Sequence, residues 1–289
     1  GHTPTSSGFE RWAEQHGTPR WVLCEQGAPD ASGSAELFVH GDLALGVSDL
    51  VSELKKLGKQ PAASDMAQAL LGADRLCGEL LQGALADEPG LSEGAAARAV
   101  VESMPEGSLL MLGNSLPIRD VDQYVTRSRQ LQVVSQRGAN GIDGLVSGAI
   151  GSALQSGVPT LILLGDVSLL HDLGGLASLG LLEAQTLAIA VIDNEGGRIF
   201  DQLPVRELYA QSANAAQFWR TPPKLSFSQV GALFHMRYVA PATELAARAA
   251  TLQALAEPGP TLLHLRVEPE SAYRVRKRVL KELAARSGG

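Results

Sequence analysis

Two polar side chains follow two apolar runs near the middle of this 289-residue chain. Asp166 comes after the run 158–164, and Asn194 comes after the run 187–192 and Asp193. Mg²⁺ prefers hard oxygen donors such as carboxylate and amide oxygens, and oxygens of substrate phosphates often complete its coordination shell. The Gly196-Gly197 pair would let a ligand approach the backbone closely. These residue types indicate a site for Mg²⁺ and a bound diphosphate.

The apolar runs are short and bounded by polar residues, as in strands of a parallel sheet that is buried on both faces. In such a sheet, ligands bind beyond the carboxyl ends of the strands. Asp166 and Asn194 would therefore meet at one edge of the sheet. Taken alone, the acid and the amide are more typical of ordinary strand-to-loop turns than of a metal site.

Two more polar segments follow predicted strands. The first is 113–119, where Ser115 offers a hydroxyl and Arg119 lies one helical turn further on. The second is 137–144, where glycines surround Ile142. The planar fork of arginine pairs with a carboxylate through two hydrogen bonds, so these segments suit an acidic substrate. The alternative for each segment is a mobile loop with a surface arginine.

The order of predicted elements supports a doubly covered sheet. From residue 92 onward, predicted strands and helices alternate, which favours an α/β fold: a three-layer αβα parallel sheet. Strands are expected at 108–112, 132–135, 158–164, 187–192, 237–239 and 262–267, and helices at 92–104, from 117, from 144, near 173–182, at 226–234 and at 242–255.

The first part of the chain predicts a helix at 9–16, strands at 21–24 and 36–40, and helices at 45–57 and 63–84. An α/β unit that begins with a helix lacks the strand that would precede this helix, and one face of its sheet cannot be buried. We therefore expect the sequence to start inside a second Rossmann-like α/β domain. We place the domains at 1–85 and 86–289, with the boundary uncertain between about 60 and 90.

Composition excludes several classes of function. The formal net charge of −7 argues against nucleic acid as the main partner. No apolar run is long enough for a membrane span, and no signal-peptide pattern is present. Cys24 and Cys77 are expected to be buried and unpaired, which is typical of a cytoplasmic protein.

The metal motif resembles the signature of thiamine-diphosphate enzymes, a Gly-Asp-Gly and an Asn-Asn at fixed spacing. Gly165-Asp166 and Asn194 match it, whereas Val167 and Asp193 replace a glycine and an asparagine. Together with 113–119, 137–144 and 194–200, it resembles the 2-succinyl-5-enolpyruvyl-6-hydroxy-3-cyclohexene-1-carboxylate synthase (MenD) family, specifically the C-terminal portion. The fold implied for 86–289 is the diphosphate domain, preceded by part of the family's central domain.

The resemblance implies roles for individual residues. The implied metal ligands are Asp166, Asn194 and the Gly196 carbonyl, and the metal is Mg²⁺ or Mn²⁺. Substrates are expected to meet Ser115, Arg119 and Arg137. The remaining cofactor contacts are expected from Asn114, Ser115, Asn140, Ile142, Val167, Ser168, Ile199 and Phe200, with Ile142 beneath the cofactor and the last two residues walling the cleft.

The activity implied is that of a transferase in menaquinone biosynthesis. It decarboxylates 2-oxoglutarate and adds the succinyl-semialdehyde carbanion to isochorismate, in a homodimer or homotetramer. In the family, the glutamate that activates the cofactor belongs to a separate pyrimidine-binding domain, so no catalytic residue is expected here and the fragment itself is expected to be inactive. No pattern links His171 to the cleft, and we expect no acid–base role for it.

Two other classes remain open. One is another thiamine-diphosphate-dependent 2-oxoacid decarboxylase or an acetohydroxyacid-synthase-like enzyme, which would share the metal motif but not the 137–144 segment. The other is a structural fragment that folds without performing chemistry.

Overall fold

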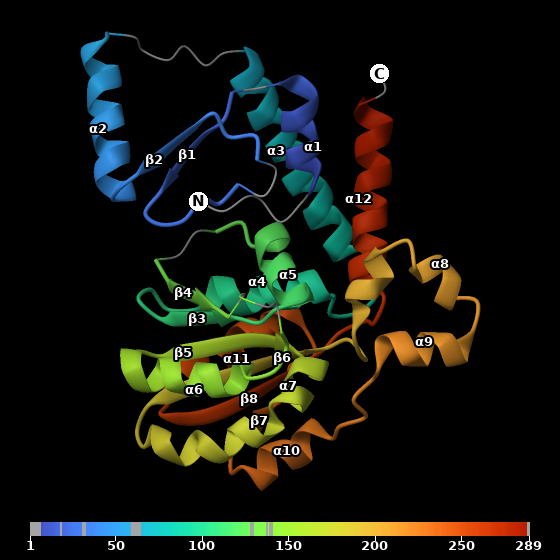
Figure 1. Cartoon of the computed structure of the whole chain (residues 1–289). Helices are drawn as coiled ribbons and strands as arrows, with labels where there is room; N and C mark the ends of the chain where they lie inside the picture. Colours follow the sequence, from blue (N-terminus) through green and yellow to red (C-terminus); the bar gives the residue numbers. More distant parts are fainter. Residues whose placement is uncertain are drawn as a thin grey trace. The chain divides into compact units, whose positions relative to one another are not determined.

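The computed structural model describes residues 7–17, 19–30, 33–58, 65–127, 130–136, 138 and 141–287 (Figure 1). The chain forms two compact units, 1–73 and 74–289. This division falls before the expected end of the first domain at residue 85. The assignment of the units to a central and a diphosphate domain stays a prediction.

The first unit contains a two-stranded parallel sheet. Strands β1 (Trp21–Cys24) and β2 (Leu37–His40) pair in register from Trp21 with Leu37 to Cys24 with His40. Helix α1 spans Ser7–His16, and helix α2 spans Leu43–Lys56. Asp42 caps α2 by accepting a hydrogen bond from the Leu45 N–H at 2.9 Å. The expected elements of this part of the chain are all present, with ends shifted by two residues or fewer.

The second unit is built on a six-stranded parallel sheet in the order β4-β3-β5-β6-β8-β7. Its two central strands, β5 (Thr160–Gly165) and β6 (Thr186–Asp193), are neighbours, with Gly165 opposite Ile192. The other strands are β3 (Leu109–Leu112), β4 (Gln132–Ser135), β7 (Arg237–Val239) and β8 (Gly259–Arg266). The predicted parallel α/β sheet is confirmed.

Alternate residues of the buried strands face opposite layers of helices. On β5, Leu161 and Leu163 belong to one hydrophobic core, whereas Ile162 and Leu164 belong to the other. The first core contains residues of α4 (Glu93–Ser103), α5 (Leu116–Tyr124), α11 (Glu244–Ala256), α12 (Ser271–Ser287) and the end of α3 (Asp65–Ala86). The second contains residues of α6 (Leu145–Ser156), α10 (Phe227–Leu233) and the 3₁₀ helix η1 (Leu173–Leu182). The sheet is therefore the middle of three layers (Figure 1).

Several elements differ from the sequence-based expectation. The segment expected as a helix near 173–182 is a 3₁₀ helix, and a short helix α7 (Asp166–His171) precedes it. The sequence analysis placed no element at 206–209, 213–220 or 271–287, which form α8, α9 and α12. Both cysteines are free, but only Cys24 is buried, and Cys77 is half-buried.

None of the helices within the described part of the chain is both long enough and apolar enough to cross a lipid bilayer.

Candidate functional site

A cavity of about 420 Å³ lies at the carboxyl ends of the central strands. Asp166 follows β5 directly, and Asn194 follows β6 directly. Because β5 and β6 are parallel neighbours, these two side chains reach the same edge of the sheet. Both residues line the cavity, as does Gly196. The structure thus brings together the three residues of the predicted metal site.

Asp166 is buried and is held by two backbone donors. Its Oδ1 accepts from the Val167 N–H at 2.8 Å, and its Oδ2 accepts from the Gly196 N–H at 2.7 Å. Burial raises the pKa of Asp166 to about 6, and the nearby Asp193 carboxyl acts in the same direction. A cation beside this carboxylate would favour its charged form and oppose the effect of burial.

Asn194 has one side-chain oxygen that is available to a ligand. Its Nδ2 donates to Glu93 Oε1 at 3.0 Å, while its backbone carbonyl accepts from Arg198 Nε at 2.9 Å. Asn194 Oδ1 is buried and has no hydrogen-bond partner among the described residues. A buried acceptor without a partner is costly unless a ligand satisfies it. This oxygen is the observation that fits a bound cation best.

Gly196 must be glycine for two reasons. Its φ of +118° is rarely adopted by residues with a side chain. A Cβ at this position would also lie 2.1 Å from the carbonyl oxygen of Arg220. The same carbonyl accepts from the Gly197 N–H at 2.6 Å, so the loop is packed against the end of α9 (Ala213–Arg220).

The donor set suits a hard cation. It offers one carboxylate, one amide oxygen and a backbone carbonyl, with room in the cavity for water or phosphate oxygens. In the part of the chain that the structure describes, no group of three or more His, Cys, Asp or Glu side chains is arranged to hold a metal. Softer transition metals, which favour thiolate and imidazole ligands, therefore fit less well than Mg²⁺ or Mn²⁺.

Most of the other predicted site residues also line this cavity. They are Ser115, Arg119, Ile142, Val167, Ser168, Ile199 and Phe200. Asn114 does not line it, because both Nδ2 hydrogen bonds of Asn114 go to backbone carbonyls, of Gln136 at 3.0 Å and of Gly141 at 2.6 Å. Its role as a cofactor contact stays a prediction. Arg137 and Asn140 lie outside the described residues.

Ser115 has a strained backbone at the cavity wall. Its φ of 72° and ψ of −127° are uncommon for a residue with a side chain. Arg119 Nη1 donates to the Ser115 carbonyl at 2.6 Å, one turn along α5. Strained residues of this kind concentrate at ligand sites, because the strain holds a group in a geometry that relaxation would lose.

The cavity also contains polar residues to which the sequence analysis assigned no role: Glu93, His171, Arg198 and Thr221. His171, for which no sequence pattern indicated a place at the cleft, lies at the end of α7 on the cavity wall, and the expectation that it has no acid–base role stays a prediction. Glu93 comes just after Ser92, which caps α4 as expected, and an acid there ordinarily faces solvent. No sequence pattern indicated its burial.

Glu93 forms a buried acid pair with Asp120 of α5. Burial raises the pKa of Glu93 to about 7. Burial and the charge of Glu93 hold the pKa of Asp120 well above its usual range. A charge on Glu93 thus disfavours ionisation of Asp120, so it is unfavourable for both carboxyls to be charged at once. Glu93 Oε1 accepts from Asn194 Nδ2, whereas Glu93 Oε2 is buried without a hydrogen-bond partner among the described residues.

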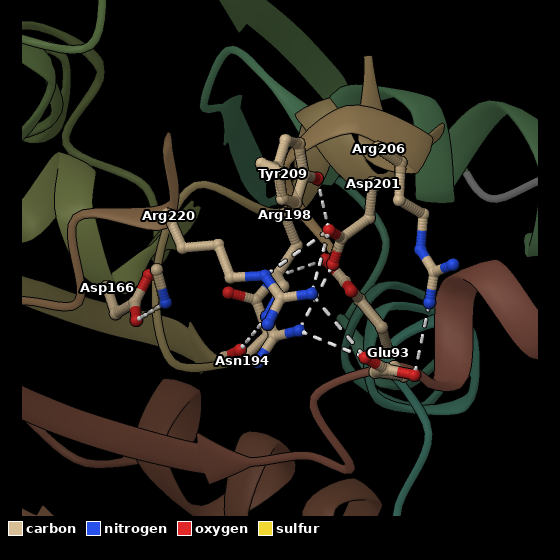
Figure 2. Close-up of polar contacts among 10 residues, drawn as sticks. Glu93, Asp166, Asn194, Arg198, Asp201, Arg206, Tyr209 and Arg220 are labelled. Atoms are coloured by element: carbon tan, nitrogen blue, oxygen red, sulfur yellow. Dashed lines mark hydrogen bonds and ion pairs between the residues drawn. The ribbon is translucent and has the colours of Figure 1, made fainter. Parts of the chain in front are cut away.

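A cluster of polar side chains around Asp201 contacts the segment that follows β6. Figure 2 shows Arg198, Tyr209 and Arg220 converging on Asp201. Asp201 accepts from Arg198 Nη1 at 3.1 Å, from Arg220 Nη2 at 3.2 Å and from the Tyr209 hydroxyl. Because Arg198 also binds the Asn194 carbonyl, this cluster fixes the backbone of the candidate metal site.

Asp193, which replaces the asparagine of the motif, is not among the residues that line the cavity. Its Oδ2 lies 2.8 Å from His264 Nε2, and its Oδ1 accepts from the Glu195 N–H at 3.3 Å. Burial alone would raise the pKa of Asp193, but the hydrogen bonds from His264 and Glu195 lower it overall. Both carboxylate oxygens of Asp193 therefore already have partners at the end of β6, in His264 and Glu195.

Comparisons with known proteins show what the chain as a whole resembles. No family model matches the chain. The chain is 36% identical over 292 residues to the 2-succinyl-5-enolpyruvyl-6-hydroxy-3-cyclohexene-1-carboxylate synthase of Sorangium cellulosum, covering 95% of this chain and 46% of that protein. The synthase of Rubrobacter xylanophilus is 32% identical over 285 residues, with 98% and 48% covered. The chain thus spans about half the length of these curated relatives.

Solved structures show the same fold at low sequence identity. Benzoylformate decarboxylase from Polynucleobacter necessarius superposes with a TM-score of 0.51 at 20% identity, covering 62% of this chain and 34% of that one. A thiamine diphosphate-dependent 4-hydroxybenzoylformate decarboxylase of Rhodococcus jostii gives a TM-score of 0.53 at 18% identity, covering 63% and 33%. At this identity the likeness concerns the fold alone.

Proposed function

Since this chain is related over nearly all its length to the 2-succinyl-5-enolpyruvyl-6-hydroxy-3-cyclohexene-1-carboxylate synthases, we propose that it binds Mg²⁺ and thiamine diphosphate as part of such an enzyme. The observation that carries the proposal is the convergence of Asp166, Asn194 and Gly196 at the ends of adjacent strands, with Asn194 Oδ1 buried and unpartnered among the described residues. Mn²⁺ would satisfy the same donors.

Each part of the cavity would have its own task. Asp166, Asn194 and the Gly196 carbonyl would hold the cation, which in turn would bind the diphosphate. The apolar side chains of Ile142 and Ile199 would exclude water from the organic part of the cofactor. When bound, thiamine diphosphate would supply the electron sink for removal of CO₂ from a 2-oxoacid.

The polar wall of the cavity would select acidic substrates. Arg119 presents a guanidinium beside Ser115, and a guanidinium pairs with a carboxylate through two hydrogen bonds. This chemistry suits 2-oxoglutarate and isochorismate, each with two carboxylates. We assign the same role to Arg137, which lies outside the described residues.

The full activity would need more than these residues. Deprotonation of the bound cofactor needs an acid–base group, which typically contributes about 10²- to 10⁴-fold in rate. Glu93 is the glutamate of the cavity wall, but its carboxylate is already engaged with Asn194. We therefore keep the proposal that this group comes from a pyrimidine-binding domain, and that the active enzyme is a cytoplasmic homo-oligomer.

Replacement of the metal ligand tests the proposal. Asp166→Ala should abolish Mg²⁺-dependent binding of thiamine diphosphate, measured by calorimetry, while the circular dichroism spectrum stays that of the wild type. Asp172→Ala is the matched control, because Asp172 accepts two hydrogen bonds from Ser147 and lies outside the cavity. Unchanged cofactor affinity in Asp166→Ala, or an equal loss in the control, would contradict the metal site.

A second experiment distinguishes the alternatives. The structural-fragment hypothesis expects no Mg²⁺-dependent binding of thiamine diphosphate even by the wild-type chain. Another decarboxylase would bind the cofactor but would not prefer a dicarboxylic 2-oxoacid such as 2-oxoglutarate over a monocarboxylic one such as pyruvate. Competition between these two oxoacids, with the chain supplied together with a pyrimidine-binding domain, separates the two enzymes.

A further inference from the structure

Glu93 is held rigidly against the candidate metal site. It is the first residue of α4 and is fully buried. Its backbone N–H donates to Ser271 Oγ at 3.0 Å, which ties the start of α4 to the start of α12. The next residue, Gly94, lies so close to the ring of Tyr124 that a Cβ there would be 2.6 Å from it. The Glu93 carboxyl therefore has a fixed position.

This carboxyl determines which way the Asn194 amide faces. A carboxyl oxygen accepts hydrogen bonds and an amide NH₂ donates them, and the NH₂ of Asn194 faces Glu93 Oε1 at 3.0 Å. The amide oxygen is then on the other side of the group, where it is buried without a partner among the described residues. If the amide turned over, its NH₂ would occupy the place of the oxygen and repel a cation.

Asn194 lacks a second anchor of this kind. The hydrogen bond to Glu93 is the one that its side chain makes among the described residues, and the bond from Arg198 goes to its backbone carbonyl. The last torsion of an asparagine side chain is soft and roughly two-fold, so the amide orientation depends on its partners. Without Glu93, the two amide orientations would no longer differ strongly in energy.

We propose that Glu93 is a positioning residue that fixes Asn194 Oδ1 toward the cation, an inference that rests on the proposed function of this site. Outer partners of metal ligands usually change metal affinity by about 10- to 100-fold when they are replaced. The contact that carries the inference is the hydrogen bond from Asn194 Nδ2 to Glu93 Oε1, since Glu93 Oε2 is buried without a hydrogen-bond partner among the described residues. Glu93 thus orients Asn194 although it lies 101 positions earlier in the sequence, on helix α4.

The test compares three substitutions of Glu93 with one control. Glu93→Met keeps the length of the side chain but removes the acceptor, and Glu93→Ala removes the side chain. Glu93→Gln keeps the shape of the side chain and an acceptor oxygen for Asn194, so it should retain binding. Glu102→Ala is the control, because Glu102 is a buried glutamate of the same helix that binds Arg248 and Thr126 outside the cavity.

The first readout needs no metal. The side-chain NH₂ of Asn194, assigned by its loss in Asn194→Ala, should exchange with solvent at least about tenfold faster in Glu93→Met than in the wild type, by nuclear magnetic resonance. Exchange should be unchanged in Glu102→Ala. If the exchange rate of Asn194 does not change in either Glu93→Met or Glu93→Ala, the inference is overturned, whether or not the chain binds metal.

The second readout is the affinity for Mn²⁺ in the presence of thiamine diphosphate. Glu93→Met should weaken it about 10- to 100-fold, and Glu93→Gln should stay within about threefold of the wild type. In an Asn194→Ala background, Glu93→Met should cause no further loss, because the two residues act through one contact. A further loss of tenfold or more would overturn the inference, whereas absence of binding by the wild type would instead refute the proposed function.

Discussion

Replacing Asp201 with alanine tests how the loop that carries Gly196 is held in place. The Asp201 side chain is 3% exposed and accepts from Arg198, Arg220 and the Tyr209 hydroxyl (Figure 2). Arg198 continues the chain of contacts to the Asn194 carbonyl, at 2.9 Å. The substitution therefore removes the centre of the cluster that supports the candidate metal site.

The expected loss of stability follows from burial. The Arg198 side chain is 8% exposed, so Asp201→Ala leaves its charge buried without its nearest carboxylate. Removing one partner of a buried ion pair costs about 3–5 kcal/mol. Glu270 lies 3.8 Å from Arg198 and 3.5 Å from Arg220 and compensates in part. We expect the free energy of unfolding to fall by about 3 kcal/mol at pH 7.

The loss of unfolding free energy caused by Asp201→Ala should become smaller at low pH. Burial alone would raise the pKa of Asp201, but the hydrogen bonds from Tyr209 and Arg198 lower it overall. The pKa of this carboxyl is thus lower in the folded protein than in the unfolded chain, where it is about 3.9. Its contribution is complete above that value and is lost as the pH falls through the folded pKa. The difference between wild type and variant should be constant from pH 5 to 8 and shrink below about pH 4.

Urea unfolding followed by tryptophan fluorescence measures this difference, since Trp219 packs on Tyr209 with ring centroids 5.8 Å apart. Asp87→Ala is the matched control: Asp87 lies 2.9 Å from Arg278, but both side chains are exposed, at 69% and 42%. An exposed pair contributes about 0–1 kcal/mol. If Asp201→Ala costs no more than Asp87→Ala, or if its cost persists unchanged below pH 4, the reasoning is refuted.

Three further predictions concern the site and its glycines. Arg119→Lys should weaken binding of 2-oxoglutarate more than binding of thiamine diphosphate, because lysine lacks the bidentate fork; calorimetry with each ligand checks this. Gly196→Ala should lower the free energy of unfolding by at least about 2 kcal/mol, owing to its positive φ and the clash with Arg220, and should abolish metal binding. The control Gly151→Ala, at a helix position with open space, should instead stabilise by about 0.5–1 kcal/mol, both measured in urea. The chain alone should release no CO₂ from 2-oxoglutarate above the rate of free cofactor, and clear release would contradict the proposed need for a second domain.

The sequence by itself determined the parallel sheet and the edge at which the candidate site lies. The apolar runs before Asp166 and Asn194 are too short for most helices and end at polar residues, and both became central strands. Parallel strands must expose their carboxyl ends at one edge, so two ligands 28 positions apart could be placed together without coordinates. The glycine at 196 was likewise informative, since its backbone angle excludes other residues.

Only the tertiary structure decided what surrounds these ligands. Glu93, His171 and Asp201 carry no local signal, because an acid in a first helical turn or a histidine at the end of a short helix is usually solvated. Glu93 is buried because α4 packs against α5 and the start of α12, and it meets Asn194 across 101 positions of sequence. Helix periodicity shows which face of a segment is apolar. Contacts between helices that are distant in sequence decide which polar group becomes buried beside the candidate metal site.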